Sequence, residues 1–284
     1  MNSKIGVFVR SRPLLLQEAR GKRCVSIDND SVLIADKKFN FDCVFDENDN
    51  QSTIYDKCVR SLVEGCFQGY NGTVFACKFT PIFFVCVLTF GIVLDGQTGS
   101  GKTYSIVGGS QEEEGIIPRA IRQIFTTLSK EKGNRISNIR VSMMEIYNDE
   151  CKDLLHMDIP SRDIMIREDK DGKIFFTGAR EEVVTDFQSA MYFLNHGNIN
   201  RTTAETLMNQ TSSRSHVRMY ALVVYSALNT CRLYLLCRSS CLSTTAHLRL
   251  APMNPVVSTF KQSCISLIWL VRNEPNVPVL KALA

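Results

Sequence analysis

The 284-residue sequence lacks the features that mark several classes of protein. Its eleven cysteines form no C-x-x-C pair and no regular framework, which argues against a disulfide scaffold and a redox motif. Cys231, Cys237 and Cys241 have a spacing that is unfavourable for zinc. The first residues, Met1–Ile5, contain no apolar core of a secretory signal. These absences predict a cytoplasmic protein with reduced thiols.

Long hydrophobic runs are also missing, with one near exception. Residues Phe79–Leu94 are sixteen uncharged and mostly apolar residues, which is shorter than the ~20 that a membrane-spanning helix needs. Aromatic and β-branched side chains dominate the run and favour a buried strand or an aggregation-prone segment. The length therefore argues against a membrane partner, and a membrane-anchored protein remains an alternative.

The last part of the chain lacks two residue types altogether. Residues 217–284 contain no Asp and no Gly, and they carry seven Lys and Arg against a single acid, Glu274. We interpret this stretch as the product of a frameshift or a wrongly joined exon. The rival interpretation is a basic tail that binds nucleic acid. Because its positive charges are scattered along the stretch, we expect no nucleic-acid partner.

What the sequence does contain is a complete G-x-x-x-x-G-K-[ST] phosphate loop at residues 96–103. Its members are Gly96, Gln97, Thr98, Gly99, Ser100, Gly101, Lys102 and Thr103. The glycines let successive backbone N–H groups converge on an anion without Cβ clashes. Lys102 can reach the outer phosphates, and the Thr103 hydroxyl suits Mg²⁺. The loop therefore predicts a site for a nucleoside triphosphate with Mg²⁺.

Hydrophobic periodicity predicts alternating strands and helices around this loop. A strand over Ile5–Arg10 ends at Pro13, and a strand over Thr73–Ala76 is aimed at the phosphate loop. We expect one helix over 51–67 and another that begins at Thr103. A third should follow residues 115–119 and run through Ser129, and a fourth should run from the N-cap Asp186 to near His196-Gly197. Further expectations are a strand over 136–147, a turn over 148–155, a hairpin over 164–184 and a strand over 217–226.

The N-x-x-S-S-R-S-H element at Asn209–His216, the phosphate loop and several further stretches together resemble the kinesin motor domain. The resemblance covers most of residues 5–216 except 77–95, and the N-x-x-S-S-R-S-H element at Asn209–His216 is its most specific part. The other matching stretches are Arg10–Pro13, Phe39–Phe45, Gly69–Ala76, the phosphate loop with Tyr104, Val141–Leu155 and Gly197–Asn209. The amino-acid sequences of Arg167–Gly172 and Ile116–Ala120 look closest to those of the chromokinesin branch.

This resemblance implies an α/β P-loop NTPase fold, with a central mixed sheet and helices on both faces. It also implies ATP hydrolysis coupled to movement along microtubules, a cytoplasmic and cytoskeletal location, and ATP and Mg²⁺ as ligands. Arg10, Arg12, Pro13 and Tyr104 fall on the family's adenine-pocket positions, and Gly96 to Thr103 match its phosphate cradle. Ser212, Ser213 and Arg214 match the first switch, where Ser213 joins Thr103 as a metal-binding position.

Two departures from the family divide the chain into four predicted segments: 1–76 and 96–216 of the motor domain, an apolar insertion at 77–95, and a tail at 217–284 without family match. In the family a single aromatic residue joins the strand ending at Ala76 to the loop beginning at Gly96. Because Cys77-Lys78 and Leu94-Asp95 can encode splice signals, we interpret the insertion as a retained in-frame intron.

The second departure concerns catalysis. The family's second switch, Asp-x-x-Gly-x-Glu, cannot occur after His216, because that part of the chain has neither Asp nor Gly. Arg214 then lacks its glutamate partner, so we expect impaired nucleotide binding and hydrolysis close to absent. Microtubule binding should also be weakened. The basic positions around Lys170–Arg180 fit a microtubule contact and a solvated hairpin equally well. The alternative function is a non-catalytic fragment that binds microtubules or another partner.

Overall fold

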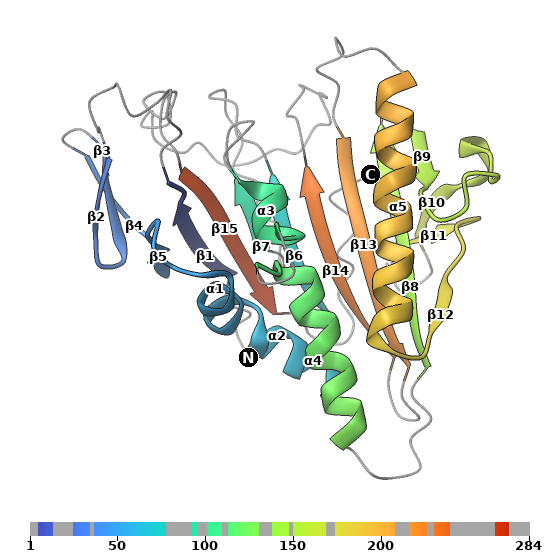
Figure 1. The fold of residues 1–284 in the computed structure, drawn as a ribbon, viewed down its shortest axis with the longest axis horizontal. Helices are drawn as coiled ribbons and strands as arrows, with labels where there is room; N and C mark the ends of the chain where they lie inside the picture. The colour runs from blue at the N-terminus through green and yellow to red at the C-terminus, as the bar shows by residue number, and fades with distance from the viewer. Residues whose placement is uncertain are drawn as a thin grey trace.

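The computed structural model describes residues 5–13, 25–34, 37–77, 92–95, 101–109, 113–130, 138–147, 150–168, 174–207, 216–225, 230–238 and 265–272. Over these residues a twisted mixed sheet carries a layer of helices on one face (Figure 1). The helices contact one another in that layer: α1 (Gln51–Cys58) contacts α2 (Arg60–Phe67), α2 contacts α4 (Ile116–Lys130), and α4 contacts α3 (Lys102–Ile106) and α5 (Phe187–Leu207). Of the two helical layers that the resemblance implies, the described residues supply this one.

The main sheet has ten strands in the order β12-β8-β13-β14-β6-β7-β15-β1-β5, with β9 paired to β8. β6 runs parallel to β7 and β14, β1 runs parallel to β5, and the other pairs are antiparallel. The strands are β1 (Ile5–Ser11), β5 (Cys43–Phe45), β6 (Gly72–Cys77), β7 (Ile92–Asp95), β8 (Asn138–Tyr147), β9 (Glu150–Asp153), β12 (Glu182–Val184), β13 (His216–Tyr225), β14 (Thr230–Arg238) and β15 (Ile265–Arg272). Two small antiparallel sheets are β2 (Val25–Asp28), β3 (Ser31–Ile34) and β4 (Lys37–Asn40), and β10 (Met165–Glu168) with β11 (Ile174–Thr177).

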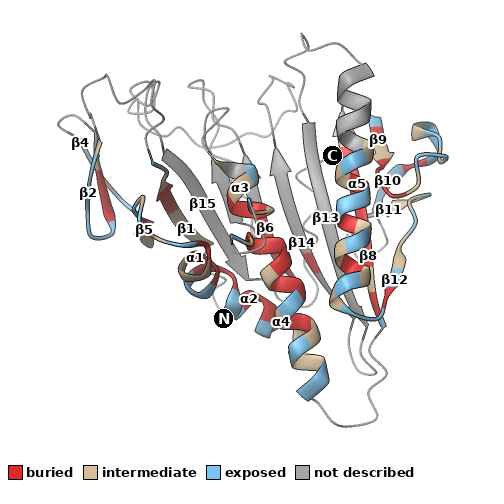
Figure 2. Ribbon diagram, in the orientation of Figure 1, coloured by how far each residue is buried: buried red, intermediate tan, exposed pale blue. Residues whose placement is uncertain are grey.

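The helical layer forms because its helices carry apolar stripes at helical spacing. On α4, Ile117, Ile121 and Ile124 are buried in the main hydrophobic core, and exposed residues become frequent towards the end of the helix (Figure 2). The helices are α1 (Gln51–Cys58), α2 (Arg60–Phe67), α3 (Lys102–Ile106), α4 (Ile116–Lys130) and α5 (Phe187–Leu207), with a short 3-10 turn at Ser161–Asp163. The helix predicted over 51–67 is therefore present, divided at Val59.

α5 begins as predicted but ends much later than the sequence indicated. The Asp186 carboxylate accepts a hydrogen bond from the Ser189 N–H at 2.8 Å, which is the expected N-cap. The helix then passes through Gly197 to Leu207, so the predicted end near His196-Gly197 is wrong. A Cβ on Gly197 would lie 2.4 Å from the Met143 sulfur and 3.2 Å from Leu155. Gly197 therefore allows α5 to pack closely on β8 and does not terminate the helix.

The apolar segment before the phosphate loop contributes a strand. β6 confirms the strand predicted over Thr73–Ala76, and β7 at Ile92–Asp95 lies beside it in parallel, pairing Val74 with Ile92. The phosphate loop therefore follows β7, which lies next to β6, the strand that was predicted to precede the loop. Residues 78–91 lie outside the described residues. Over the described ranges, no helix combines the length and apolar character needed to cross a membrane.

The tail after residue 216 also contributes strands. β13 confirms the strand predicted over 217–226, and the apolar stretches around Leu233 and Leu267 form β14 and β15. The antiparallel pair β10–β11 confirms a hairpin within the predicted range 164–184, whereas residues 182–184 pair with β8 as β12. The prediction of a turn over 148–155 is wrong at residues 150–153, which pair with β8 as β9. Leu154 and Leu155, which follow β9, are buried.

Candidate nucleotide-binding site

The described residues include seven of the predicted site residues. They are Arg10, Arg12, Pro13, Gly101, Lys102, Thr103 and Tyr104. The other predicted site residues lie outside the described ranges: Gly96, Gln97, Thr98, Gly99, Ser100, Ser212, Ser213 and Arg214. The described part of the site therefore consists of the end of β1, the last glycine of the phosphate loop and the helix that follows it.

Gly101 makes the turn from the phosphate loop into α3. It adopts φ 93° and ψ 16°, a left-handed conformation that glycine reaches without a Cβ penalty. Its carbonyl accepts the Ser105 N–H at 2.9 Å, which is the first turn of α3. A Cβ at Gly101 would meet no atom within 4 Å, and the Thr103 side chain is exposed. This open turn, with a hydroxyl in the first helical turn, fits a phosphate group and its Mg²⁺.

Arg10 is the most strongly anchored of the predicted base-side residues. It is only 8% exposed, and its Nη1 donates to Ser105 Oγ at 2.8 Å and to Gln51 Oε1 at 3.0 Å. Its guanidinium carbon lies 5.0 Å from the centre of the Tyr104 ring, within the range of a cation–π contact. Burial lowers the pKa of Arg10 from its ordinary value, and nearby Tyr104 opposes this shift. Since an arginine in a protein stays protonated, Arg10 places a buried positive charge against α3.

Tyr104 occupies a tight position between two other parts of the chain. Arg10 lies over its ring, and a Cβ on Gly109 would come within 3.2 Å of its Cε2 atom. The structure thus brings together Arg10 and Tyr104, which the resemblance assigned to one pocket. Arg12 Nη1 donates to the Pro13 carbonyl at 2.9 Å, and Pro13 is exposed just beyond the end of β1.

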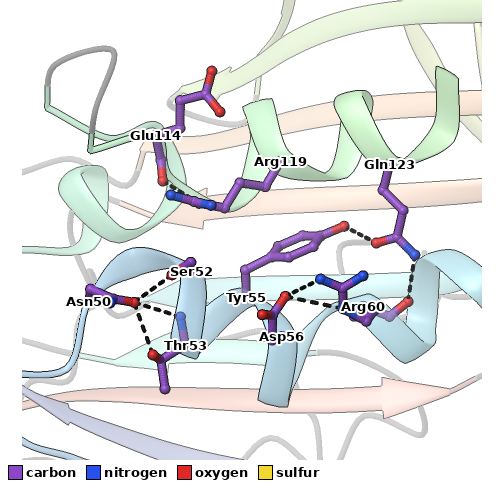
Figure 3. Close-up of polar contacts among 9 residues, drawn as sticks. All are labelled: Asn50, Ser52, Thr53, Tyr55, Asp56, Arg60, Glu114, Arg119 and Gln123. Carbon is purple, nitrogen blue, oxygen red and sulfur yellow. Dashed lines mark hydrogen bonds and ion pairs between the residues drawn. The ribbon is translucent and has the colours of Figure 1, made fainter. Parts of the chain in front are cut away.

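Gln51 was not among the residues predicted for this site. Its amide nitrogen donates to the Tyr104 carbonyl at 2.6 Å, while its oxygen accepts from Arg10. The side chain is buried although it is the first residue of α1, where the preceding Asn50 caps the helix by accepting from the Thr53 N–H at 2.8 Å (Figure 3). A polar first-turn residue after an N-cap is ordinary in sequence, so no local signal marks Gln51.

Comparison with known proteins decides the family. The model of the kinesin motor domain matches residues 9–80 and 83–240. The chain belongs to the kinesin motor domain family. Its P-loop NTPase fold is also that of a solved structure titled as a fast kinesin, with a TM-score of 0.68 and 27% identity over 89% of this chain and 69% of that one.

Two curated kinesins show how much of a whole motor the chain represents. The human kinesin-like protein KIF27 is 39% identical over 222 residues, which is 75% of this chain and 14% of KIF27. Human centromere-associated protein E is 36% identical over 218 residues, 75% of this chain and 7% of that protein. The chain thus spans a small part of these relatives. The chromokinesin branch and the four segment boundaries stay predictions.

Within the predicted basic stretch Lys170–Arg180, the structure describes residues 174–180, which include one basic residue, Arg180. The Arg180 backbone N–H donates to Asp153 Oδ2 at 3.0 Å, and its guanidinium lies 3.7 Å from the Asp158 carboxylate. Lys170 lies outside the described residues. Arg180 is exposed, so its side chain is accessible to a partner, and a microtubule contact here stays a prediction.

Asp153, on β9, holds this region together from a buried position. Besides Arg180, it accepts the backbone N–H groups of Leu155 at 2.9 Å and His156 at 3.1 Å, and it is 1% exposed. Replacing Asp153 with Asn should lower the free energy of unfolding by about 2 kcal/mol, since an amide NH₂ would face a backbone donor. Urea unfolding measures this change.

The control for this prediction is the exposed acid beside it. Asp158→Asn removes a carboxylate whose side chain is 69% exposed, so the free energy of unfolding should change by no more than about 0.5 kcal/mol. Equal losses in the two variants would contradict a structural role that is specific to Asp153.

Proposed function

We propose that this chain is a microtubule motor domain that binds ATP with Mg²⁺ and couples ATP hydrolysis to movement along microtubules. Lys102 binds the β- and γ-phosphates, and Thr103 with Ser213 binds Mg²⁺. Arg10, Arg12, Pro13 and Tyr104 surround the base. Ser212, Ser213 and Arg214 form the first switch, which orders around the γ-phosphate.

The observation that carries this proposal is the turn at Gly101. The phosphate-loop motif runs into α3 through a left-handed glycine, within a chain that belongs to the kinesin family. A glycine in this conformation lets the loop close on an anion immediately before the helix. The buried Arg10 contacts the ring of Tyr104 on α3, and both residues fall on positions that the family uses for adenine.

The residues of this chain contribute binding and orientation to the reaction. Lys102 places a positive charge at the phosphates, and Arg214 adds one from the first switch. Mg²⁺, when bound, neutralises charge that develops on the phosphate oxygens. Because residues 217–284 contain no Asp-x-x-Gly-x-Glu element, this stretch supplies no switch glutamate to pair with Arg214 and help position the attacking water. Turnover is therefore expected to be very slow, and the microtubule contacts weakened.

The direct test is ATP hydrolysis by the purified chain with and without microtubules. We expect ATP binding that is measurable by calorimetry, and turnover at least a hundredfold below that of an intact kinesin motor domain assayed in parallel. Absence of any ATP binding would contradict the proposal. Robust microtubule-stimulated turnover would contradict the expected impairment while supporting the motor assignment.

A second candidate function is favoured by one observation, the lack of Asp and Gly after His216. Without a sensor for the γ-phosphate, the chain would act as a non-catalytic fragment that binds microtubules or another partner. Co-sedimentation with microtubules distinguishes the two functions. Binding that is the same with ATP, with ADP and without nucleotide would support the fragment, whereas nucleotide-dependent binding would support the motor.

A further inference from the structure

The Gln51 side chain forms a bridge between three elements at the candidate site. It begins on α1, accepts a hydrogen bond from Arg10 of β1, and donates to the Tyr104 carbonyl of α3. These contacts join residues that are 41 and 53 positions apart in sequence. The amide therefore uses its acceptor for one side of the site and its donor for the other.

The bridge acts on a helix that has few internal hydrogen bonds of its own. α3 contains five residues, so most of its carbonyls belong to the last turn, where a helix leaves carbonyl groups without helical partners. The Tyr104 carbonyl receives its hydrogen bond from Gln51, and the Ser105 hydroxyl receives one from Arg10. Two side chains from outside α3 thus fix the orientation of the turn that begins with Lys102 and Thr103.

Burial makes these contacts difficult to replace with water. Gln51 is 5% exposed, Ser105 is 1% exposed and Arg10 is 8% exposed. When a buried donor or acceptor loses its partner, it bears the cost of desolvation without compensation. An apolar residue in place of Gln51 would leave both the Arg10 guanidinium and the Tyr104 carbonyl short of a partner, so both groups would be free to shift.

We propose that Gln51 is a positioning residue for the nucleotide site, holding Arg10 against the Tyr104 ring and fixing the helix that carries Lys102 and Thr103. This inference rests on the proposed function, since it assumes that the pocket binds ATP. Gln51 itself need not touch the nucleotide. Its effect reaches the base through Arg10 and Tyr104, and reaches the phosphates through α3.

A matched control is available on α4. The Gln123 amide also bridges helices, accepting from the Tyr55 hydroxyl and donating to the Arg60 carbonyl at 3.3 Å (Figure 3). It has the same chemistry as Gln51 but joins α4 to α1 and α2 away from α3. Gln51→Met and Gln123→Met each remove an amide bridge while keeping a side chain of similar length.

The experiment measures the affinity of the full chain and both variants for a fluorescent ATP analogue, at a temperature well below each melting temperature. Thermal unfolding is recorded in parallel. Both variants should melt at lower temperature, but only Gln51→Met should weaken ATP binding, by about tenfold, with Gln123→Met within twofold of the unmodified chain. This separation of affinity from stability is what a purely structural role would not produce.

The other results overturn the inference in distinguishable ways. Unchanged affinity in Gln51→Met, or an equal loss in Gln123→Met, overturns the positioning role and leaves the proposed function standing. No binding by the unmodified chain overturns the proposed function and this inference with it. If Gln51→Met does not fold, Gln51→Glu decides, because it keeps the acceptor for Arg10 but has no donor for Tyr104. About threefold weaker binding supports the inference, and unchanged binding overturns it.

Discussion

Replacing Lys102 with alanine is expected to raise the dissociation constant for ATP about a hundredfold. Lys102 is the lysine of the phosphate-loop motif and the first residue of α3. A contact between its ammonium group and phosphate oxygens is a charge-assisted hydrogen bond, the strongest class available to this site. Loss of such contacts corresponds to about 2–3 kcal/mol of binding free energy. Isothermal titration calorimetry with ATP measures the change.

The control for this variant is a lysine of similar character elsewhere. Lys130 is the exposed last residue of α4, so Lys130→Ala removes the same charge without affecting the loop. Its affinity for ATP should match that of the unmodified chain. If Lys102→Ala binds ATP equally well, the triphosphate is not bound by the phosphate loop, and the proposed function fails.

A large loss of stability is expected from Gly115→Ala, at the junction between α3 and α4. A Cβ at Gly115 would lie 2.6 Å from the Gly108 nitrogen and 2.6 Å from the Ile106 carbonyl oxygen. Both are backbone atoms, so they can move only if the connection between the helices opens. We expect the free energy of unfolding to fall by about 3 kcal/mol, measured by urea denaturation.

Gly197→Ala provides the comparison for this steric argument. The nearest atom to a new Cβ there is the Met143 sulfur at 2.4 Å, which belongs to a flexible side chain. Alanine also favours the helix over glycine by about 1 kcal/mol, which offsets part of the crowding. The loss should therefore stay below about 1 kcal/mol. An equal loss of unfolding free energy in the two variants would show that crowding against backbone atoms is not what makes Gly115→Ala destabilising.

Gly197 and the helix that contains it show how far the sequence could predict this fold. Helix and strand types followed from periodicity, and the Asp186 cap correctly located the start of α5. Its end was misplaced because glycine usually stops a helix, whereas Gly197 is required by the approach of Met143 from β8. That contact is tertiary, and nothing beside Gly197 in the sequence indicates it.

The candidate site was predictable to the extent that its residues are contiguous. The phosphate loop is recognisable because eight adjacent residues carry one chemical requirement. Gln51 was missed because its role depends on Arg10 and Tyr104, which meet it only in the folded chain. Pairing of β15 with β1 could not be predicted either, since an apolar run indicates a strand but not its neighbour.

Because β15 is near the end of the chain, the sheet around Arg10 can be completed only late in synthesis. β1, which carries Arg10, lies between β5 and β15 in the sheet, and β15 in turn joins it to β6 and β7. During translation, Arg10 and the phosphate loop leave the ribosome long before residues 265–272. Contacts between such distant segments form slowly, because a long loop must close first. Nascent chains stalled before β15 should therefore expose an unpaired edge of β1, where chaperones would bind.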